Sequence, residues 1–176
     1  PSENELVELI GRARSADALV LADEVYAGLS PQQSDRFPCL AARYDNVISI
    51  ASFSKSFGLP GLRVGWIASR NKTLIERIKR IRTHANSFAS RPAEIIAISV
   101  TRNASRILQR NAEITRIGRE ALAAFVERKS KLWSLSMPQQ GPVALARWKG
   151  PGTASDLCRH ALEELKFFSE KVRILG

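Results

Sequence analysis

The spacing of apolar residues changes along the chain, and each change predicts a different kind of element. Near the N-terminus, apolar side chains recur at helical spacing, which predicts a helix over about residues 3–14. Ser2 and Glu5 stand three residues apart at its start, which is the pattern of a capping box. We therefore expect a short amphipathic helix that begins just after Ser2.

Three later segments are apolar without a helical period. Residues 18–23, 47–53 and 63–69 are short, and the second is rich in β-branched side chains. A continuous apolar run is typical of a strand that is buried on both faces, as in a parallel sheet under helices. A loop at 28–38 and a Gly/Pro turn at 55–61 separate the segments. The pattern predicts three neighbouring strands in one largely parallel sheet.

Beyond the third strand, the apolar spacing becomes helical again. Leu74 and Ile78 share one face of a predicted helix, with basic residues around the rest of it. Pro92 suits the first turn of the next helix, where its missing N–H costs nothing. Apolar residues then recur at helical spacing as far as Trp133, which predicts a long helix that is continuous over most of 94–131.

The C-terminal part of the sequence predicts smaller elements. The segment from Met137 to Trp148 has the pattern of a strand pair or an extended stretch around Gly141-Pro142. A helix capped by Thr153 or Ser155 follows, and Val172–Leu175 has the composition of a short terminal strand.

The order of these elements indicates an α/β protein with two domains. Strands that alternate with helices favour a parallel or mixed sheet. The long helix would lead from this sheet into a small α+β lobe. We therefore expect one domain at residues 1–102 and a second, smaller one at 103–176.

The composition is that of an ordinary globular protein. Hydrophobic residues make up 44% of the 176 residues and charged residues 25%, which excludes wholesale disorder. No apolar run approaches the roughly 20 residues of a membrane-spanning helix. The N-terminus has no signal-peptide pattern, and two distant cysteines, Cys39 and Cys158, are no disulfide framework. We therefore expect a cytoplasmic protein.

The net charge of +10 is concentrated in one half of the chain. Residues 1–69 carry six Lys/Arg against eight Asp/Glu, and residues 70–176 carry 21 against nine. The basic positions alternate with an apolar stripe, as on helices that cover a core. No aromatic interleaving accompanies them. The charge predicts weak non-specific polyanion binding and no specific nucleic-acid partner.

Polar side chains gather where the predicted strands end. Asp23 and Tyr26 follow the first strand, and Ser52, Ser54 and Lys55 follow the second, while Arg63 begins the third. Ligands of open α/β sheets collect at the carboxyl ends of strands. A lysine can form a Schiff base there, and arginine with hydroxyl groups suits a phosphate. An acid suits a ring nitrogen that must stay protonated. Together these groups match the needs of pyridoxal phosphate (PLP).

These residues lie in two motifs that resemble a known family. The segment from Ser52 to Gly65, SFSKSFGLPGLRVG, is similar to the lysine signature of class I/II aminotransferases, which are fold-type I PLP-dependent enzymes. The segment Asp23-Glu-Val-Tyr26 resembles the family's upstream cofactor motif. The resemblance covers about residues 1–150. It implies part of a PLP-binding large domain with a mostly parallel sheet, followed by a long helix and a partial small domain.

The resemblance assigns roles to individual residues. Lys55 matches the lysine that forms the internal aldimine and later moves the proton, and Asp23 matches the acid that pairs with the pyridinium nitrogen. Tyr26 matches the phenol that hydrogen-bonds the ring oxygen. Ser52 and Arg63 match the phosphate ligands, with Ser54 as a weaker candidate. Read singly, Asp23 also suits a turn, Tyr26 a core position, and Arg63 a surface strand.

The chain also departs from the family pattern. The family's ring-oxygen asparagine, Gly-rich phosphate loop and stacking aromatic belong to segments upstream of the matched region. We therefore expect the C-terminal half of a dimeric aminotransferase for amino acids and 2-oxo acids, inactive when isolated. Arg173, in Val172-Arg-Ile174, resembles the family's substrate-carboxylate arginine, but it also reads as an ordinary edge-strand arginine.

Other functions have weaker support in the sequence. The Ser52-x-x-Lys55 spacing also fits serine β-lactamases, but no Ser-Asp-Asn or Lys-Thr-Gly motif follows it. His84 and His160 have no metal-ligand spacing to other residues, so no metal is expected. The alternatives that stay open are a PLP-dependent lyase or decarboxylase, and a catalytically inactive remnant that serves as a dimerising or binding module.

Overall fold

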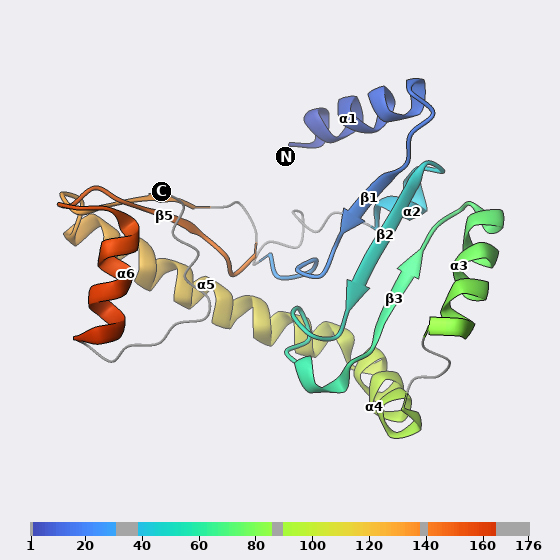
Figure 1. The fold of residues 1–176 in the computed structure, drawn as a ribbon. Coiled ribbons are helices and arrows are strands. Elements are labelled where there is room, and N and C mark those ends of the chain that lie inside the picture. The colour runs from blue at the N-terminus through green and yellow to red at the C-terminus, as the bar shows by residue number, and fades with distance from the viewer. Residues whose placement is uncertain (1, 31–38, 86–89, 138–140, 165–176) are drawn as a thin grey trace. The chain divides into compact units, whose positions relative to one another are not determined.

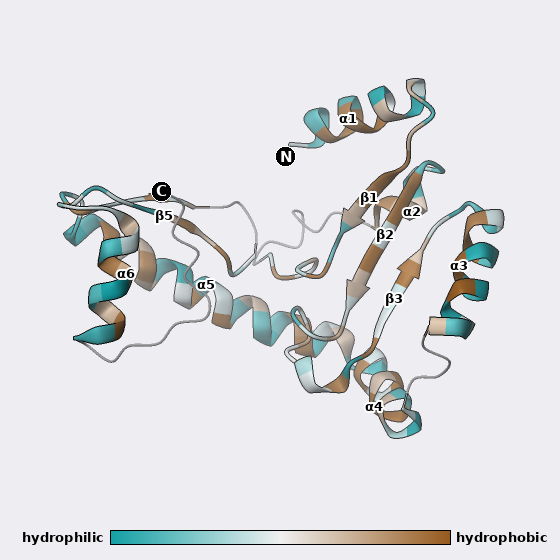
Figure 2. Ribbon diagram, in the orientation of Figure 1, coloured by the Kyte–Doolittle hydropathy of each residue, from teal (hydrophilic) through white to brown (hydrophobic). Residues whose placement is uncertain are grey.

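A computed structural model describes residues 2–30, 39–85, 90–137 and 141–164 (Figure 1). The chain divides into two compact units, Pro1–Glu113 and Ile114–Gly176, which are described separately below. Among the described residues, the first unit contains a three-stranded sheet with helices, and the second contains the C-terminal part of a long helix, a two-stranded sheet and a short helix. Figure 2 shows apolar residues concentrated on β1 and β2, while α1 alternates between polar and apolar positions.

The first helix, α1 (Glu3–Ser15), begins with the predicted capping box. The Ser2 side chain accepts a hydrogen bond from the Glu5 amide at 3.3 Å, and the Ser2 amide donates to the Glu5 carboxylate at 2.7 Å. The backbone and hydroxyl of Ser2 both hydrogen-bond this carboxylate, so the pKa of Glu5 is lowered from its usual 4.5. Only Ile10 of this helix is fully buried, with 1% of its surface exposed.

The three predicted strands are neighbours in one sheet, as the sequence indicated. They are β1 (Val20–Asp23), β2 (Val47–Ser52) and β3 (Gly65–Ala68), in that order across the sheet. β1 pairs with β2 in parallel, while β2 pairs with β3 antiparallel, so the described sheet is mixed. The short helix α2 (Leu40–Arg43) lies in the connection from β1 to β2. The connection from β2 to β3 holds only the 3₁₀ turn η2 (Pro60–Leu62), without the crossover helix that usually joins parallel strands.

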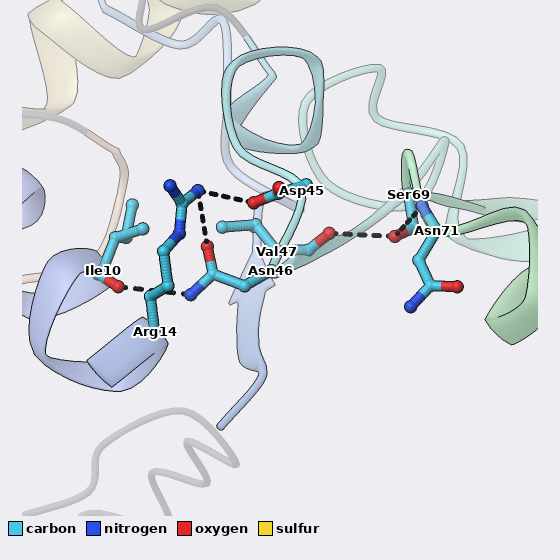
Figure 3. Close-up of polar contacts among 7 residues, drawn as sticks. All are labelled: Ile10, Arg14, Asp45, Asn46, Val47, Ser69 and Asn71. Carbon is cyan, nitrogen blue, oxygen red and sulfur yellow. Dashed lines mark hydrogen bonds and ion pairs between the residues drawn. The ribbon is translucent and has the colours of Figure 1, made fainter. Parts of the chain in front are cut away.

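A network of polar side chains fastens α1 to the end of the sheet where β2 begins (Figure 3). The Asn46 amide donates to the Ile10 carbonyl at 3.2 Å, and Arg14 pairs with Asp45. On the other side of β2, the Ser69 hydroxyl donates to the Val47 carbonyl at 3.1 Å. These contacts hold the amino end of β2 between α1 and the end of β3.

Three helices follow the sheet: α3 (Lys72–Ala85), α4 (Arg91–Arg102) and α5 (Ala104–Arg128). The prediction of one continuous helix over most of 94–131 is wrong, because the helix breaks at Asn103. The Asn103 side chain donates to the Ser99 carbonyl at 2.9 Å, and its amide donates to the Val100 carbonyl at 3.1 Å. Such local hydrogen bonds of asparagine compete with the helical ladder. α4 buries Ala97 and Val100 against Phe53, which follows β2.

The second unit contains the antiparallel pair β4 (Trp133–Ser136) and β5 (Leu145–Trp148). A strand pair around Gly141-Pro142 was predicted, but its first strand lies before Met137. Trp133, where the apolar helical spacing ends, pairs with Trp148, and the ring centroids are 5.0 Å apart. The edge-to-face contact of these two half-buried rings stabilises the strand pair.

The helix α6 (Ala154–Glu163) confirms Thr153 as its cap. The Thr153 hydroxyl and amide both donate to the Asp156 carboxylate, at 2.7 and 2.9 Å, and the pKa of Asp156 is lowered because these bonds favour its charged form. The predicted strand at 172–175, with Arg173, lies outside the described residues.

Candidate functional site

The strand directions bring several predicted site residues to one edge of the sheet. β1 and β2 are parallel, so Asp23 and Ser52 lie at their carboxyl ends, with Asp23 paired in register to Ile50. β3 is antiparallel, so its first residue, Gly65, pairs with Ser52 at this same edge. Arg63 lies just before β3 and therefore comes to the edge as well. The mixed sheet thus collects residues from three separate segments.

The turn after β2 carries Lys55. The Ser54 amide donates to the Ser52 hydroxyl at 3.3 Å, and the Gly58 amide donates to the Lys55 carbonyl at 3.0 Å. Gly58 has a φ of +70°, a conformation that side chains other than glycine seldom adopt. Lys55 is exposed, and its side-chain nitrogen makes no hydrogen bond or ion pair with any residue that the structure describes. The turn is ordered by its backbone, while the amine stays available.

The turn after β1 carries Tyr26. The Val25 amide donates to Oδ1 of Asp23 at 3.1 Å, and the Ala27 amide donates to the Glu24 carbonyl at 2.9 Å. Gly28 ends the turn with a φ of +84°. Tyr26 is half-buried and Asp23 is exposed. The bond from Val25 orients the Asp23 carboxylate and leaves its second oxygen without a described partner.

Arg63 adopts a left-handed backbone conformation, with a φ of +53°. Such conformations are costly in residues other than glycine and tend to persist where the surroundings impose them. Its guanidinium donates to the Pro60 carbonyl at 3.1 Å, and its side chain is exposed. Arg63 and Ser52 also line a groove of about 620 Å³ between β2, β3 and α3. Arg63 therefore borders an open groove that also carries the basic residues Lys79 and Arg82.

Sequence reasoning missed two residues, Glu24 and Ser56, whose hydrogen bonds hold the backbone near this edge of the sheet. The carboxylate of Glu24, next to Asp23, accepts hydrogen bonds from the Leu40 amide at 2.8 Å and the Ser49 hydroxyl at 2.7 Å. Ser56, next to Lys55, is buried and hydrogen-bonds the turn that carries Tyr26. Glu24 lies inside the Asp23–Tyr26 motif and Ser56 inside the lysine motif, but neither motif distinguishes a buried polar residue from an exposed one.

The six residues supply complementary chemistry. Lys55 offers an amine that can react with a carbonyl, Asp23 a carboxylate that can hold a cationic N–H, and Tyr26 a phenol. Arg63 and the two serine hydroxyls can bind a phosphate. Within the described ranges, no group of three or more His, Cys, Asp or Glu side chains is placed to hold a metal ion. None of the helices in those ranges is long and apolar enough to cross a membrane.

Comparison with known proteins gives matches across most of the chain. A family model described as aminotransferase class I and II matches residues 1–173. Histidinol-phosphate aminotransferase 2 of Gluconobacter oxydans (strain 621H) is 39% identical over 87 residues, which are 49% of this chain and 23% of that protein. Capreomycidine synthase of Streptomyces vinaceus is 26% identical over 158 residues, or 88% of this chain and 39% of that one.

Solved structures share the fold. A PLP-dependent aminotransferase from Streptococcus suis 89-1591 has a TM-score of 0.79 and 26% identity, covering 93% of this chain and 42% of that chain. The PLP-dependent cyclase OrfR also has a TM-score of 0.79, with 25% identity over 90% of this chain and 43% of its own. This chain therefore matches less than half of the length of each of these four relatives.

Proposed function

Because the chain belongs to the aminotransferase class I and II family, we propose that it carries the lysine side of a PLP site for amino-group transfer between an amino acid and a 2-oxo acid. The solved relatives confirm the expected fold, part of the large domain of a fold-type I PLP-dependent transferase followed by a smaller lobe. The observation that carries the proposed function is the strand arrangement that brings Asp23, the Lys55 turn and Arg63 to one edge of the sheet.

The residues at this edge fit PLP by the chemistry of their donors. The exposed amine of Lys55 suits its aldehyde, and the exposed guanidinium of Arg63 suits its phosphate. The second oxygen of the Asp23 carboxylate, which has no partner among the described residues, suits the ring nitrogen. The Tyr26 phenol suits the ring oxygen, and the hydroxyls of Ser52 and Ser54 add phosphate donors. Each polar feature of the cofactor thus has a partner of complementary charge or hydrogen-bonding type.

When bound, PLP supplies an electron sink for negative charge that develops at the substrate α-carbon. Lys55 would anchor the cofactor, and its amine would hold or move a proton at the substrate α-carbon. Asp23 keeps a positive charge favourable at the ring nitrogen, because a carboxylate stabilises a nearby cation. Arg63 with the serine hydroxyls neutralises the phosphate and fixes the orientation of the ring.

Arg173 is proposed as the residue that binds the substrate carboxylate, on the resemblance of its sequence alone. A guanidinium binds a carboxylate through two parallel hydrogen bonds, so lysine at this position would not reproduce the geometry. We expect Arg173→Lys to raise KM for the amino acid with little change in kcat. We further propose that the whole protein is cytoplasmic and forms a homodimer. Light scattering of the purified protein tests the dimer.

A second candidate is a cyclisation of the substrate that uses the same lysine. It is favoured by the similarity to the PLP-dependent cyclase OrfR, which covers 90% of this chain at 25% identity. The two candidates share Lys55, Asp23 and Arg63 and differ in the fate of the amino group. Product analysis separates them, since transfer converts the 2-oxo acid to an amino acid while cyclisation leaves it unchanged.

Absorbance spectroscopy of the whole protein mixed with PLP tests the step that both candidates share, the attachment of PLP to Lys55. The wild type is expected to develop a visible band that borohydride bleaches, and Lys55→Ala is expected to lose it. Lys72→Ala, which changes an exposed lysine on α3, serves as the control and should retain the band. A band of equal strength in Lys55→Ala would show that Lys55 is not the anchor.

A further inference from the structure

Ser56 is a buried polar residue at the candidate site that the proposed chemistry does not use. It follows Lys55 directly, and only 3% of its surface is exposed. Its hydroxyl oxygen lies 2.8 Å from the Val25 carbonyl oxygen and 2.7 Å from the Ala27 carbonyl oxygen. Its amide nitrogen lies 3.3 Å from the Val25 carbonyl oxygen. Ser56 therefore contacts the backbone on both sides of Tyr26.

The hydrogen-bonding capacity of Ser56 matches these two carbonyl groups. A serine hydroxyl has one proton to donate, and its amide has another. With the amide donating to Val25, the hydroxyl proton is available for Ala27, which is the nearer carbonyl. The residues before and after Tyr26 are thus each held by the residue after Lys55.

The helix α5 supports the same two turns from the other side. The Asn111 side-chain amide donates to the Ser56 carbonyl at 2.9 Å. A Cβ at Gly28 would lie 3.3 Å from Cδ1 of Leu108, so this leucine packs closely on the end of the Tyr26 turn. Leu108 and Asn111 are three residues apart and therefore share one face of the helix. One face of α5 thus contacts both turns.

We propose that Ser56 and Asn111 are positioning residues that fix the Tyr26 turn and the Lys55 turn relative to each other. Ser56 links the turns directly, and Asn111 holds the Ser56 backbone against α5. The consequence is that the backbone positions from which Tyr26 and Lys55 extend keep a constant spacing although both turns lie at the edge of the sheet. The importance of that spacing for cofactor chemistry rests on the proposed function.

Hydrogen exchange on the cofactor-free chain tests the link between the turns. In Ser56→Ala, the amides of Ala27 and Leu29 are expected to exchange about fivefold faster, because the Ala27 carbonyl loses its donor. Asn111→Ala is a second variant, expected to accelerate exchange at Gly58. Ser105→Ala and Gln109→Ala, which alter exposed residues of α5, are the matched controls. Exchange rates equal to those of the controls would overturn the proposal.

The PLP-loaded protein provides a second, spectroscopic measurement. The phenol partner of the ring oxygen influences the pH at which the visible band changes. Ser56→Ala is therefore expected to shift the midpoint of this change by about half a pH unit to higher pH, while Ser105→Ala leaves it in place. An unchanged midpoint would show that Ser56 does not position Tyr26. A wild type without any visible band would contradict the proposed function, and the exchange rates would still decide whether Ser56 links the turns.

Discussion

At the end of the sheet where β2 begins, Asn46 is hydrogen-bonded to Ile10 and Arg14, and Ser69 is hydrogen-bonded to Val47 (Figure 3). At the opposite edge, the charged groups of the predicted site have little to bind within the described chain. Asp23 accepts one bond from its neighbour Val25, and the Lys55 amine has no partner among the residues described. At the first end the polar groups bind other parts of the fold, while at the second the charged groups have few partners among the described residues.

The two ends of the sheet also differ in which groups fix the backbone. At the site edge, the turns themselves are fixed by buried or half-buried polar groups such as Ser56 and Glu24. Asp23 and Lys55 each stand next to one of these two residues in the sequence. They are exposed, but they therefore lie on ordered backbone. Ordered backbone under charged side chains that have few partners among the described residues is the arrangement expected of a preorganised binding site, because few of the described interactions have to be broken when the ligand arrives.

The largest expected effect is that of Lys55→Ala. The substitution removes both the anchor and the proton carrier, so the rate of amino transfer by the whole protein should fall roughly 10³-fold or more. The thermal unfolding midpoint should change little, because the side chain is exposed. Steady-state kinetics and thermal unfolding measure the two quantities. Wild-type turnover in Lys55→Arg would contradict the role given to this lysine.

Asp23→Asn should have the next largest effect. The amide keeps the shape of the side chain but loses the negative charge that favours a protonated ring nitrogen, so we expect about a 100-fold slower rate with some cofactor still bound. Asp45→Asn makes the same chemical change at the opposite end of the sheet, where the ion pair with Arg14 is exposed. That control should retain full activity. Equal losses in the two variants would remove the distinction between the two ends.

Asn46→Ala should lower stability without affecting cofactor binding, which is the reverse of the effects expected for Lys55→Ala. It removes the hydrogen bond to the Ile10 carbonyl and the contact with Arg14, so the free energy of unfolding should decrease by about 1 kcal/mol. Cofactor binding should stay the same, because the change lies at the end of the sheet away from Lys55. Chemical denaturation and a PLP titration measure the two effects. A variant that binds PLP less well without losing stability would show that this end also serves the site.

The smallest effect is expected at the cap of α1. The folded-state pKa of Glu5 is lowered by its hydrogen bonds to Ser2, so the cap stabilises the folded chain above pH 4.5 and loses this contribution as the pH falls through the folded-state pKa. Ser2→Ala should therefore be less stable than the wild type at pH 7, with a difference that shrinks in acid. Thermal unfolding at several pH values measures it, and a difference that stays constant down to pH 3 would contradict the assignment.

Local patterns in the sequence predicted the parts of the fold that local interactions determine. The caps at Ser2 and Thr153 and the three strands required only short-range signals. The break at Asn103 was missed because the apolar spacing continues through it, while its side chain bonds within the preceding turn. The early start of β4 was missed because it depends on the pairing of Trp133 with Trp148, fifteen residues away.

At the candidate site too, the sequence predicted local motifs but not the contacts between distant segments. The two motifs pointed to Asp23, Tyr26, Ser52, Ser54, Lys55 and Arg63, and the structure places them in segments that meet at one edge of the sheet. The roles of Ser56 and Asn111 could not be predicted, because their contacts join residues far apart in the sequence. A serine in a turn and an asparagine on a helix carry no signal of burial until the fold brings them to their partners.

The most direct test of the Lys55 site is to locate the lysine that PLP labels. The protein is incubated with PLP, reduced with borohydride and digested, and mass spectrometry then identifies the modified peptides. We predict that the cofactor mass is found on Lys55 and is lost in Lys55→Arg, while Lys72, Lys79 and the other lysines stay unmodified at the same PLP concentration. A label spread over those lysines, or unchanged in total amount in Lys55→Arg, would contradict a PLP site at this edge of the sheet.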